Sequence, residues 1–391
     1  MNMNVESLYG FVLQQMAAES YFEGVSLSDS DAIERSLRRG TNRLGYQNGD
    51  PAFNEGYPGL TRMTDQQITE FLASFRLVHQ WSDDPTPTGR RPVVEGDPAH
   101  PQLNSDILAN TGLSATLIRI LDSDGVPTNE YTLAIRSTEF RNSADGGDGE
   151  RDKTGADVNS ISYTGFALAQ LDALEQYYQW LRVNRDSLGN PLLPADAKLN
   201  ITGYSLGGHL ATVFTEIHRD EMNGGQTVTF NGAGRGAWDA SQGDLADVIA
   251  YYHAVLNDPA AAPDPGDQTS LLRLAAMQAR GTAFGAASLY DDPRYIWAVQ
   301  ATRTRFGLSW MPLTDENRTG TSADELITQV FGYETSHNAN VTANSGIHGP
   351  ALRVGIESQP LLQGTGGLAG TDGDFGSAHS ITLLADSLAL Q

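Results

Sequence analysis

The segment from Lys198 to His218 constrains the fold of this 391-residue chain more than any other. Its sequence, KLNITGYSLGGHLATVFTEIH, begins with a short apolar stretch, turns at glycines, and continues with apolar residues at helical spacing. A second apolar stretch, QTVTF, follows after a short polar connection. Strand, helix and strand in this order are the signature of parallel βαβ units. We therefore predict an α/β protein whose central sheet is mostly parallel and flanked by helices.

The rest of the chain alternates between periodic and irregular segments. Two strands are predicted over Leu113–Asp122 and Tyr131–Thr138, joined by the hairpin-like SDGVPTNE. Apolar residues at helical spacing predict further helices within the first 45 residues, over 65–81, over 163–183 and in the C-terminal SITLLADSLAL. Residues 259–345 are rich in proline, alanine and glycine, and we interpret them as an irregular insertion. We expect one domain over 1–391, with 1–109 as an N-terminal helical and lid region.

Composition excludes several classes of function. The formal charge is −23, from 25 basic and 48 acidic residues, and such a surface repels nucleic-acid phosphates and anionic membrane faces. The chain has no cysteine, which excludes disulfides, thiolate metal sites and cysteine catalysis. No apolar run approaches the roughly 20 residues that span a bilayer, so we expect no transmembrane segment. The N-terminal sequence lacks the pattern of a conventional signal peptide. We expect secretion without such a peptide, or otherwise a cytoplasmic location.

Gly203-Tyr204-Ser205-Leu206-Gly207 matches the pattern G-x-S-x-G between a predicted strand and a predicted helix. In that context the serine occupies a strained turn, where side chains at the flanking glycines would collide with neighbouring backbone. The turn presents the serine hydroxyl at the carboxyl edge of the sheet. The N–H of Leu206 lies at the start of the helix, where the helix dipole favours a developing negative charge. Ser205 is therefore the predicted nucleophile, and nearby His209 is predicted to pack rather than act as its base.

Three segments carry a resemblance to a known family: ITGYSLGGHLATVF, the pair NTGLSATLIRI and NEYTLAIRSTEF, and QTVTFNGAGRG. Together they resemble the class 3 (fungal-type) lipases and the bacterial true lipases that are exported without a signal peptide. The resemblance covers roughly residues 110–258 and the C-terminus. It implies a single α/β-hydrolase catalytic domain with a lid or cap insertion. The implied activity is that of a serine carboxylic-ester hydrolase, a lipase that cleaves acyl esters of lipids through an acyl-enzyme.

An activated serine needs a base and a carboxylate that orients the base, and in α/β hydrolases the chain order is serine, acid, histidine. The acid is expected at the end of a strand after QTVTF, where Asp258 precedes Pro259; in the resembling lipases a similar turn carries the acid. His379, before the C-terminal helix, is the predicted base, and His348 is the reserve. The other candidates are Asp244, Asp247, Asp264 and Asp267 for the acid and His337 for the base.

The oxyanion hole needs a second backbone N–H from the turn after the earlier strand. The resemblance implies Thr138, in Arg136-Ser137-Thr138, as this donor beside Leu206. Ser137 stands where the family usually has glycine, so the sequence leaves the donor open between Ser137 and Thr138.

Acyl transfer to water requires no cofactor. The acidic, glycine-rich loops at 145–152 and 370–376 offer oxygen ligands that suit a structural calcium ion, although neither fits the EF-hand pattern. Two segments are candidates for an apolar lid, 47–63 and the insertion 259–345; core packing is the alternative for both.

The expected partner is a lipid or another small ester, with transient contact to a lipid interface. Phospholipase A1 and short-chain carboxylesterase are alternatives within the class, because the sequence does not define pocket width. An acyltransferase, a serine peptidase and a non-catalytic binding domain are alternatives from other classes.

Overall fold

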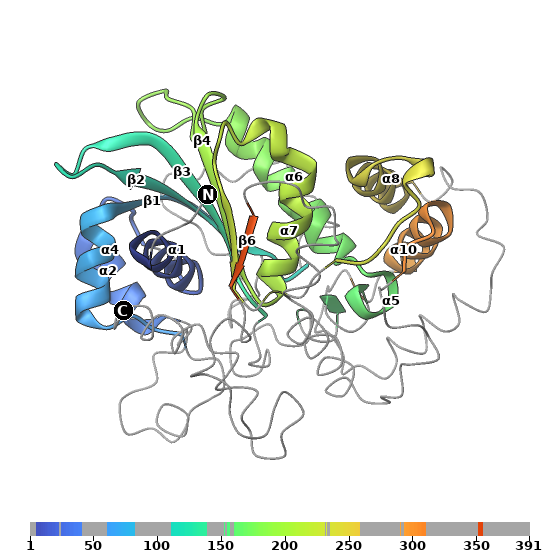
Figure 1. Ribbon diagram of the computed structural model, residues 1–391, viewed down its shortest axis with the longest axis horizontal. Helices are drawn as coiled ribbons and strands as arrows, with labels where there is room; N and C mark the ends of the chain where they lie inside the picture. The colour runs from blue at the N-terminus through green and yellow to red at the C-terminus, as the bar shows by residue number, and fades with distance from the viewer. Residues whose placement is uncertain are drawn as a thin grey trace, which may run out of the picture.

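The computed structural model describes residues 5–22, 25–40, 61–82, 111–138, 152, 155–156, 160–230, 232, 235–258, 290, 293–309 and the backbone of 351–354. Within these residues one six-stranded sheet has the order β1-β2-β3-β4-β5-β6 (Figure 1). The strands are β1 (Phe75–Ser82), β2 (Ser114–Leu121), β3 (Pro127–Ile135), β4 (Lys198–Tyr204), β5 (Thr227–Phe230) and β6 (Ala351–Val354). The helices are α1 (Val5–Ala18), α2 (Ser30–Arg39), α4 (Asp65–Ser74), α5 (Ser162–Thr164), α6 (Leu168–Val183), α7 (Leu206–His218), α8 (Leu245–Asn257) and α10 (Pro293–Phe306), with short 3-10 turns at Arg219–Glu221 and Ala240–Gln242.

The sheet has an antiparallel half and a parallel half. Strands β1, β2 and β3 pair antiparallel, whereas β3, β4, β5 and β6 pair parallel. The predicted α/β class and the βαβ unit β4–α7–β5 are confirmed. The sheet is mixed rather than mostly parallel, because the predicted hairpin β2–β3 pairs antiparallel and β1, which the sequence did not predict, adds a second antiparallel pairing.

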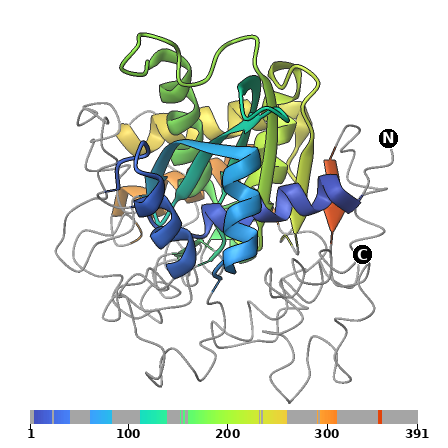
Figure 2. The same ribbon diagram turned by 90° about the vertical axis from the view of Figure 1, so that its left-hand side faces the viewer.

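Helices cover both faces of the sheet. Figures 1 and 2 show α1, α2 and α4 on one face, while α6 and α7 lie on the other with α8 and α10 outside them. In strand β3, alternate side chains point to opposite faces of the sheet and so pack against the two helical layers. Leu133 and Ile135 pack with the α6 and α7 layer, whereas Ala134 between them packs with the α1 layer. The sheet is thus buried from both sides.

The predicted helix over 65–81 is wrong in its second half. Helix α4 ends at Ser74, and Phe75 begins β1, which pairs with β2. The strand contains a register shift between Leu77 and His79. Before the shift Phe75 and Leu77 face the α1 layer, and after it Trp81 packs in the α6 layer. This irregularity interrupts the alternation that reveals a strand, and the apolar residues then mimic helical spacing.

The predicted helix over 163–183 is divided. The short α5 ends at Gly165, whose φ of 83° is left-handed, and α6 begins at Leu168. A Cβ at Gly165 would lie 2.4 Å from the Cα of Gly236, so another chain segment crosses closely at this break. Glycine is required here by both its dihedral angle and its close packing.

Two regions predicted to be peripheral contribute to the core. Val12 and Met16 of α1 are fully buried, so α1 is a structural layer of the domain. Within the insertion 259–345, predicted to be irregular, residues 293–306 form α10, which packs against α8 and buries Tyr295. Met63, at the end of the first candidate lid, is also buried in the α1 layer. The other residues of both candidate lids lie outside the described residues, apart from 61–62, 290 and 307–309, and so does the predicted C-terminal helix.

None of the helices in the described ranges combines the length and the apolar character needed to cross a bilayer.

A buried imidazole couples α7 to its neighbours. His218 is 4% exposed; its Nε2 lies 2.6 Å from Glu175 Oε2 on α6, and its Nδ1 lies 2.9 Å from Glu221 Oε1. Burial lowers the pKa of His218, but the two carboxylates outweigh burial, so its pKa is raised above the ordinary value. The stability from this imidazolium is fully present below the unfolded-state pKa of about 6.5 and is lost as pH rises through the higher folded-state pKa.

We therefore expect His218→Gln to lower the free energy of unfolding more at pH 6 than at pH 9. The difference should be about 1 kcal/mol, since hydrogen bonds to charged groups are stronger than neutral ones by about this amount. Urea unfolding at both pH values measures it. In a Glu175→Gln/Glu221→Gln background burial alone acts on the pKa of His218 and lowers it, so the same replacement should no longer cost more at pH 6 than at pH 9. Equal losses at the two pH values in the wild-type background would contradict the ion-pair assignment.

Candidate active site

Ser205 joins β4 to α7 in a backbone conformation that L-residues rarely adopt. Its φ is 56° and its ψ is −120°. Within the described residues Ser205 and Asn223 are the non-glycine residues with positive φ. Such conformations cost about 1–3 kcal/mol and persist only where the surrounding structure fixes them. The predicted strained turn between strand and helix is therefore present at Ser205.

The glycines around Ser205 allow three backbone segments to meet. A Cβ at Gly203 would lie 2.0 Å from the carbonyl oxygen of Gly207, and one at Gly207 would lie 2.2 Å from that of Ile135. A Cβ at Gly208 would lie 2.6 Å from the Cα of Gly232. Real Cβ atoms do not approach backbone this closely, so any side chain would push the segments apart. The start of α7 thus packs directly against the end of β3 and the turn after β5.

Backbone hydrogen bonds hold the turn at Ser205 on both sides. The N–H of Ser205 donates to the carbonyl oxygen of Phe230, the last residue of β5, at 3.0 Å. The carbonyl oxygen of Ser205 accepts from the N–H groups of Gly208 and His209. Leu206 is the first residue of α7, where N–H groups lack acceptors within the helix and carry the positive end of the helix dipole. This N–H is suited to stabilise negative charge near Ser205.

Ser205 is 1% exposed, which differs from the open presentation that the sequence predicts. The turn occupies the carboxyl edge of β4 as expected, but its side chain is covered.

The turn after β3 carries the two candidate donors for the oxyanion hole. Ser137 donates its N–H to Glu19 Oε1 at 3.0 Å and its hydroxyl to Glu19 Oε2 at 2.7 Å. Both donors of Ser137 are therefore engaged by a carboxylate at the end of α1. Thr138 follows and is buried. Ser137 is thus bonded to Glu19 in this structure, and Thr138 stays the predicted donor.

His209 is a packing residue, as predicted. Its ring is fully buried beside Phe166, with the ring centroids 6.3 Å apart. Its Nε2 accepts the N–H of Ala167 at 3.1 Å, at the start of α6. An imidazole nitrogen used in this way has no lone pair to take the proton of Ser205.

Asp258 does not lie at the end of a strand. Residues 245–257 form helix α8, and Asp258 is its exposed C-terminal cap residue. The premise that selected Asp258 is therefore wrong, although its role is untested. Asp244 and Asp247 form the capping box at the other end of α8, which explains both carboxylates structurally.

The remaining candidates lie outside the described residues: His337, His348, His379, Asp264 and Asp267, together with the acidic loop 370–376. Of the loop 145–152, Asp152 is described; it is buried and its Oδ1 accepts from Gln170 Nε2 at 2.8 Å. Within the described part of the chain no group of three acidic or histidine side chains is arranged to hold a metal ion. The predicted calcium ion stays a prediction.

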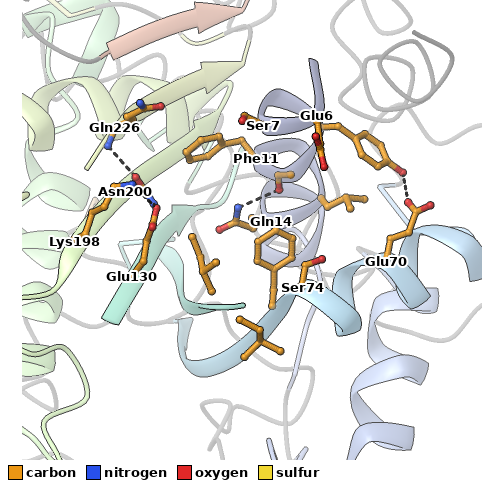
Figure 3. A pocket seen from close by; sticks show the side chains of 16 residues that line it. Glu6, Ser7, Phe11, Gln14, Glu70, Ser74, Glu130, Lys198, Asn200 and Gln226 are labelled. Atoms are coloured by element: carbon orange, nitrogen blue, oxygen red, sulfur yellow. Dashed lines mark hydrogen bonds and ion pairs between the residues drawn. The ribbon is translucent and has the colours of Figure 1, made fainter. Parts of the chain in front are cut away.

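A cavity of about 660 Å³ lies between α1 and the sheet at the edge opposite Ser205. Figure 3 shows Glu130, Lys198 and Asn200 on its strand side and Gln14 of α1 across from them. Glu130 accepts from Lys198 Nζ at 2.9 Å and from Asn200 Nδ2 at 2.8 Å. Because Lys198 begins β4 and Ser205 follows its end, this cavity is separate from Ser205.

Comparison of the chain with protein families, with characterised proteins and with solved structures finds no match.

The strain at Ser205 is testable without any activity measurement. Glycine tolerates φ of 56° and ψ of −120°, whereas alanine keeps the Cβ that makes this conformation costly. We expect Ser205→Gly to unfold at a free energy about 1 kcal/mol higher than Ser205→Ala, since relief of strain exceeds the entropy that glycine adds to the unfolded chain. Chemical denaturation of both variants gives the difference.

Ser36 is the matched position, because it lies inside helix α2 with ordinary helical geometry. There the order should reverse, with alanine more stable than glycine by about 1 kcal/mol. The same order at both positions would show that the Ser205 backbone is unstrained.

Proposed function

We propose that this protein is a serine carboxylic-ester hydrolase of the α/β-hydrolase class that cleaves acyl esters of lipids. The observation that carries the proposal is the strained Ser205 turn between β4 and α7, closed by three glycines and set against the end of β3. An ordinary turn could join β4 to α7 without this strain. The strained turn is what nucleophilic catalysis requires, because it fixes one hydroxyl beside two sources of backbone N–H groups.

The reaction follows the serine-hydrolase scheme. The Ser205 oxygen attacks the ester carbonyl carbon while His379 takes the hydroxyl proton, and the carbonyl electron pair moves to oxygen. The N–H groups of Leu206 and Thr138 stabilise that oxyanion. When the oxyanion collapses, the alcohol leaves with the proton from His379 and an acyl-Ser205 ester remains. Water then adds with His379 as base, and the acid is released as Ser205 regains its proton.

The sheet order favours a different acid from Asp258. The strand that pairs with β5 on its free side is β6, and the two strands are parallel. The carboxyl end of β6, at Val354, therefore lies at the same edge of the sheet as Ser205, where the acid is expected. Glu357 is the first acidic residue after Val354 in the sequence and precedes His379, so the order serine, acid, histidine is retained. We propose Glu357 as the orienting acid, with Asp258 as the competing candidate.

The burial of Ser205 favours lipid substrates within the ester class. Ser205 is 1% exposed, so a substrate must first gain access to it, and contact with a lipid interface is one way in which lipases gain such access. A short-chain carboxylesterase acts on dissolved esters and gains nothing from an interface.

Ser205→Ala is expected to lower ester hydrolysis by at least ~10³-fold with little change in stability. p-Nitrophenyl esters of graded chain length measure the rate, and a fluorophosphonate probe should label Ser205 in the wild-type protein. Higher activity on long chains above the concentration at which they aggregate would support a lipase. Equal hydrolysis by both proteins, or no labelling of the wild type, would refute the proposal.

Replacing each candidate acid by its isosteric amide distinguishes between the two. Glu357→Gln should lower kcat by ~10³-fold, because the histidine loses the carboxylate that fixes its tautomer, whereas Asp258→Asn should change kcat by less than about threefold. Titration of the active sites with a fluorophosphonate gives the concentration of active enzyme, so that kcat is not lowered by unfolded protein. A large loss confined to Asp258→Asn would return the acid to the end of α8.

A further inference from the structure

Glu19 is a buried carboxylate in an unusual place. It follows the last turn of α1, is 1% exposed, and faces the turn after β3 across 118 residues of sequence. Burial raises its pKa, although Arg136 and the hydrogen bonds from Ser137 and Gln15 act in the opposite direction. Burying a carboxylate costs several kcal/mol unless its oxygens are hydrogen-bonded. A position held at such a cost serves either the fold or the site.

The contacts of Glu19 converge on one short segment of backbone. Its two oxygens accept the N–H and the hydroxyl of Ser137, at 3.0 and 2.7 Å. Gln15, one turn earlier in α1, donates from Nε2 to Glu19 Oε1 and to the carbonyl oxygen of Ile135, both at 2.8 Å. Arg136 is buried, with its guanidinium 4.5 Å from the ring centroid of Tyr21. Each of the residues 135–137 therefore contacts a residue of α1 or of the segment that follows it.

The other side of this segment touches the nucleophile turn. The carbonyl oxygens of Ile135 and Arg136 would lie 2.2 and 2.6 Å from a Cβ on Gly207, two residues after Ser205. Ser137 anchors one end of the following peptide group, whose N–H belongs to Thr138, so a displacement of Ser137 would also displace that N–H. If Ser137 rotated, the Thr138 N–H would change direction, and the oxyanion hole would lose one of its two donors.

We propose that Glu19 is a positioning residue for the oxyanion hole: by accepting both donors of Ser137, it holds the peptide that directs the Thr138 N–H toward the carbonyl oxygen of the substrate. Gln15 supports Glu19 in this role. The inference rests on the proposed ester hydrolase activity, because an oxyanion forms only if Ser205 is the nucleophile. It adds a role for α1, a helix whose residues do not touch the reacting atoms.

Two replacements of Glu19 test the role. Glu19→Met keeps the length of the side chain but removes both acceptors, and we expect kcat to fall about 100-fold, the loss that follows removal of one oxyanion donor. Glu19→Gln keeps one oxygen for the Ser137 N–H, while the Ser137 hydroxyl can turn to accept from the new amide. It should restore kcat to within about fivefold of wild type. In both variants KM should change by less than about threefold.

The control replaces a carboxylate at the other end of the same strand. Glu130 begins the parallel pairing of β3 with β4 and binds Lys198 and Asn200 at the cavity in Figure 3. Glu130→Met removes comparable contacts and is expected to leave kcat within about twofold. All rates are expressed per active site titrated with fluorophosphonate, so partial unfolding does not appear as loss of kcat.

A trifluoromethyl ketone that mimics the substrate supplies the specific readout. The Ser205 oxygen adds to its carbonyl carbon, the proton goes to the base, and the carbonyl oxygen becomes a stable oxyanion in the hole. Its affinity should fall in Glu19→Met by the same factor as kcat/KM, and Glu19→Gln should recover both.

Four outcomes would overturn the inference. A Glu19→Met protein with wild-type kcat and ketone affinity would show that Glu19 does not position the hole. Equal losses in Glu19→Met and Glu130→Met would show a general structural effect. If Glu19→Met does not fold, Ser137→Ala applies the test, since it removes one of the two contacts, and an unchanged kcat would refute the role. Absence of labelling in the wild type would instead refute the hydrolase proposal and the inference with it.

Discussion

The backbone at Ser205 is the constraint on which the centre of this structure depends. A residue at φ of 56° and ψ of −120° can be held only by a tight environment, and the glycines at 203, 207 and 208 provide it by letting β4, α7 and the end of β3 approach within contact of bare backbone. The hydrogen bond from Ser205 to Phe230 adds β5 to the same junction. Three parallel strands thus end around one strained residue, and the positions of the neighbouring turns follow from this junction.

The sequence was sufficient to predict this junction but not its surroundings. The G-x-S-x-G pattern between a strand and a helix is local, so residues 198–218 are enough to recognise the turn in the sequence. Strand β1 was missed because a register shift at Leu77 and His79 disrupts its alternation, and α10 was missed because its burial depends on α8. The acid was sought in a segment that forms α8, since a run of apolar residues such as VIAYYHAVL does not distinguish helix from strand by composition alone.

The role of Glu19 was beyond the reach of sequence analysis for a different reason. Nothing in the pattern AAESYF indicates that its glutamate is buried, because acidic residues are mostly exposed. Only the packing of α1 across the sheet brings this carboxylate to Ser137. The serine at 137, which departs from the glycine usual in the resembling lipases, provides a hydroxyl that glycine lacks, and this hydroxyl makes the shorter of the two bonds to Glu19. The serine at 137 and the buried carboxylate of Glu19 therefore account for each other, because each supplies the other's hydrogen-bond partner.

This pairing changes how the N-terminal region should be understood. A helix that only covered the sheet would require apolar residues at its interface, and Val12 and Met16 meet that requirement. Gln15 and Glu19 lie in the same interface, fully or almost fully buried, and both hydrogen-bond to the end of β3. Apolar residues of similar size would bury more area without the desolvation penalty of a carboxylate, so stability alone does not account for them. A requirement for one fixed peptide orientation beside Ser205 does, because hydrogen bonds are directional and apolar contacts are not. The α1 layer thus contributes to the geometry of the site as well as to the core.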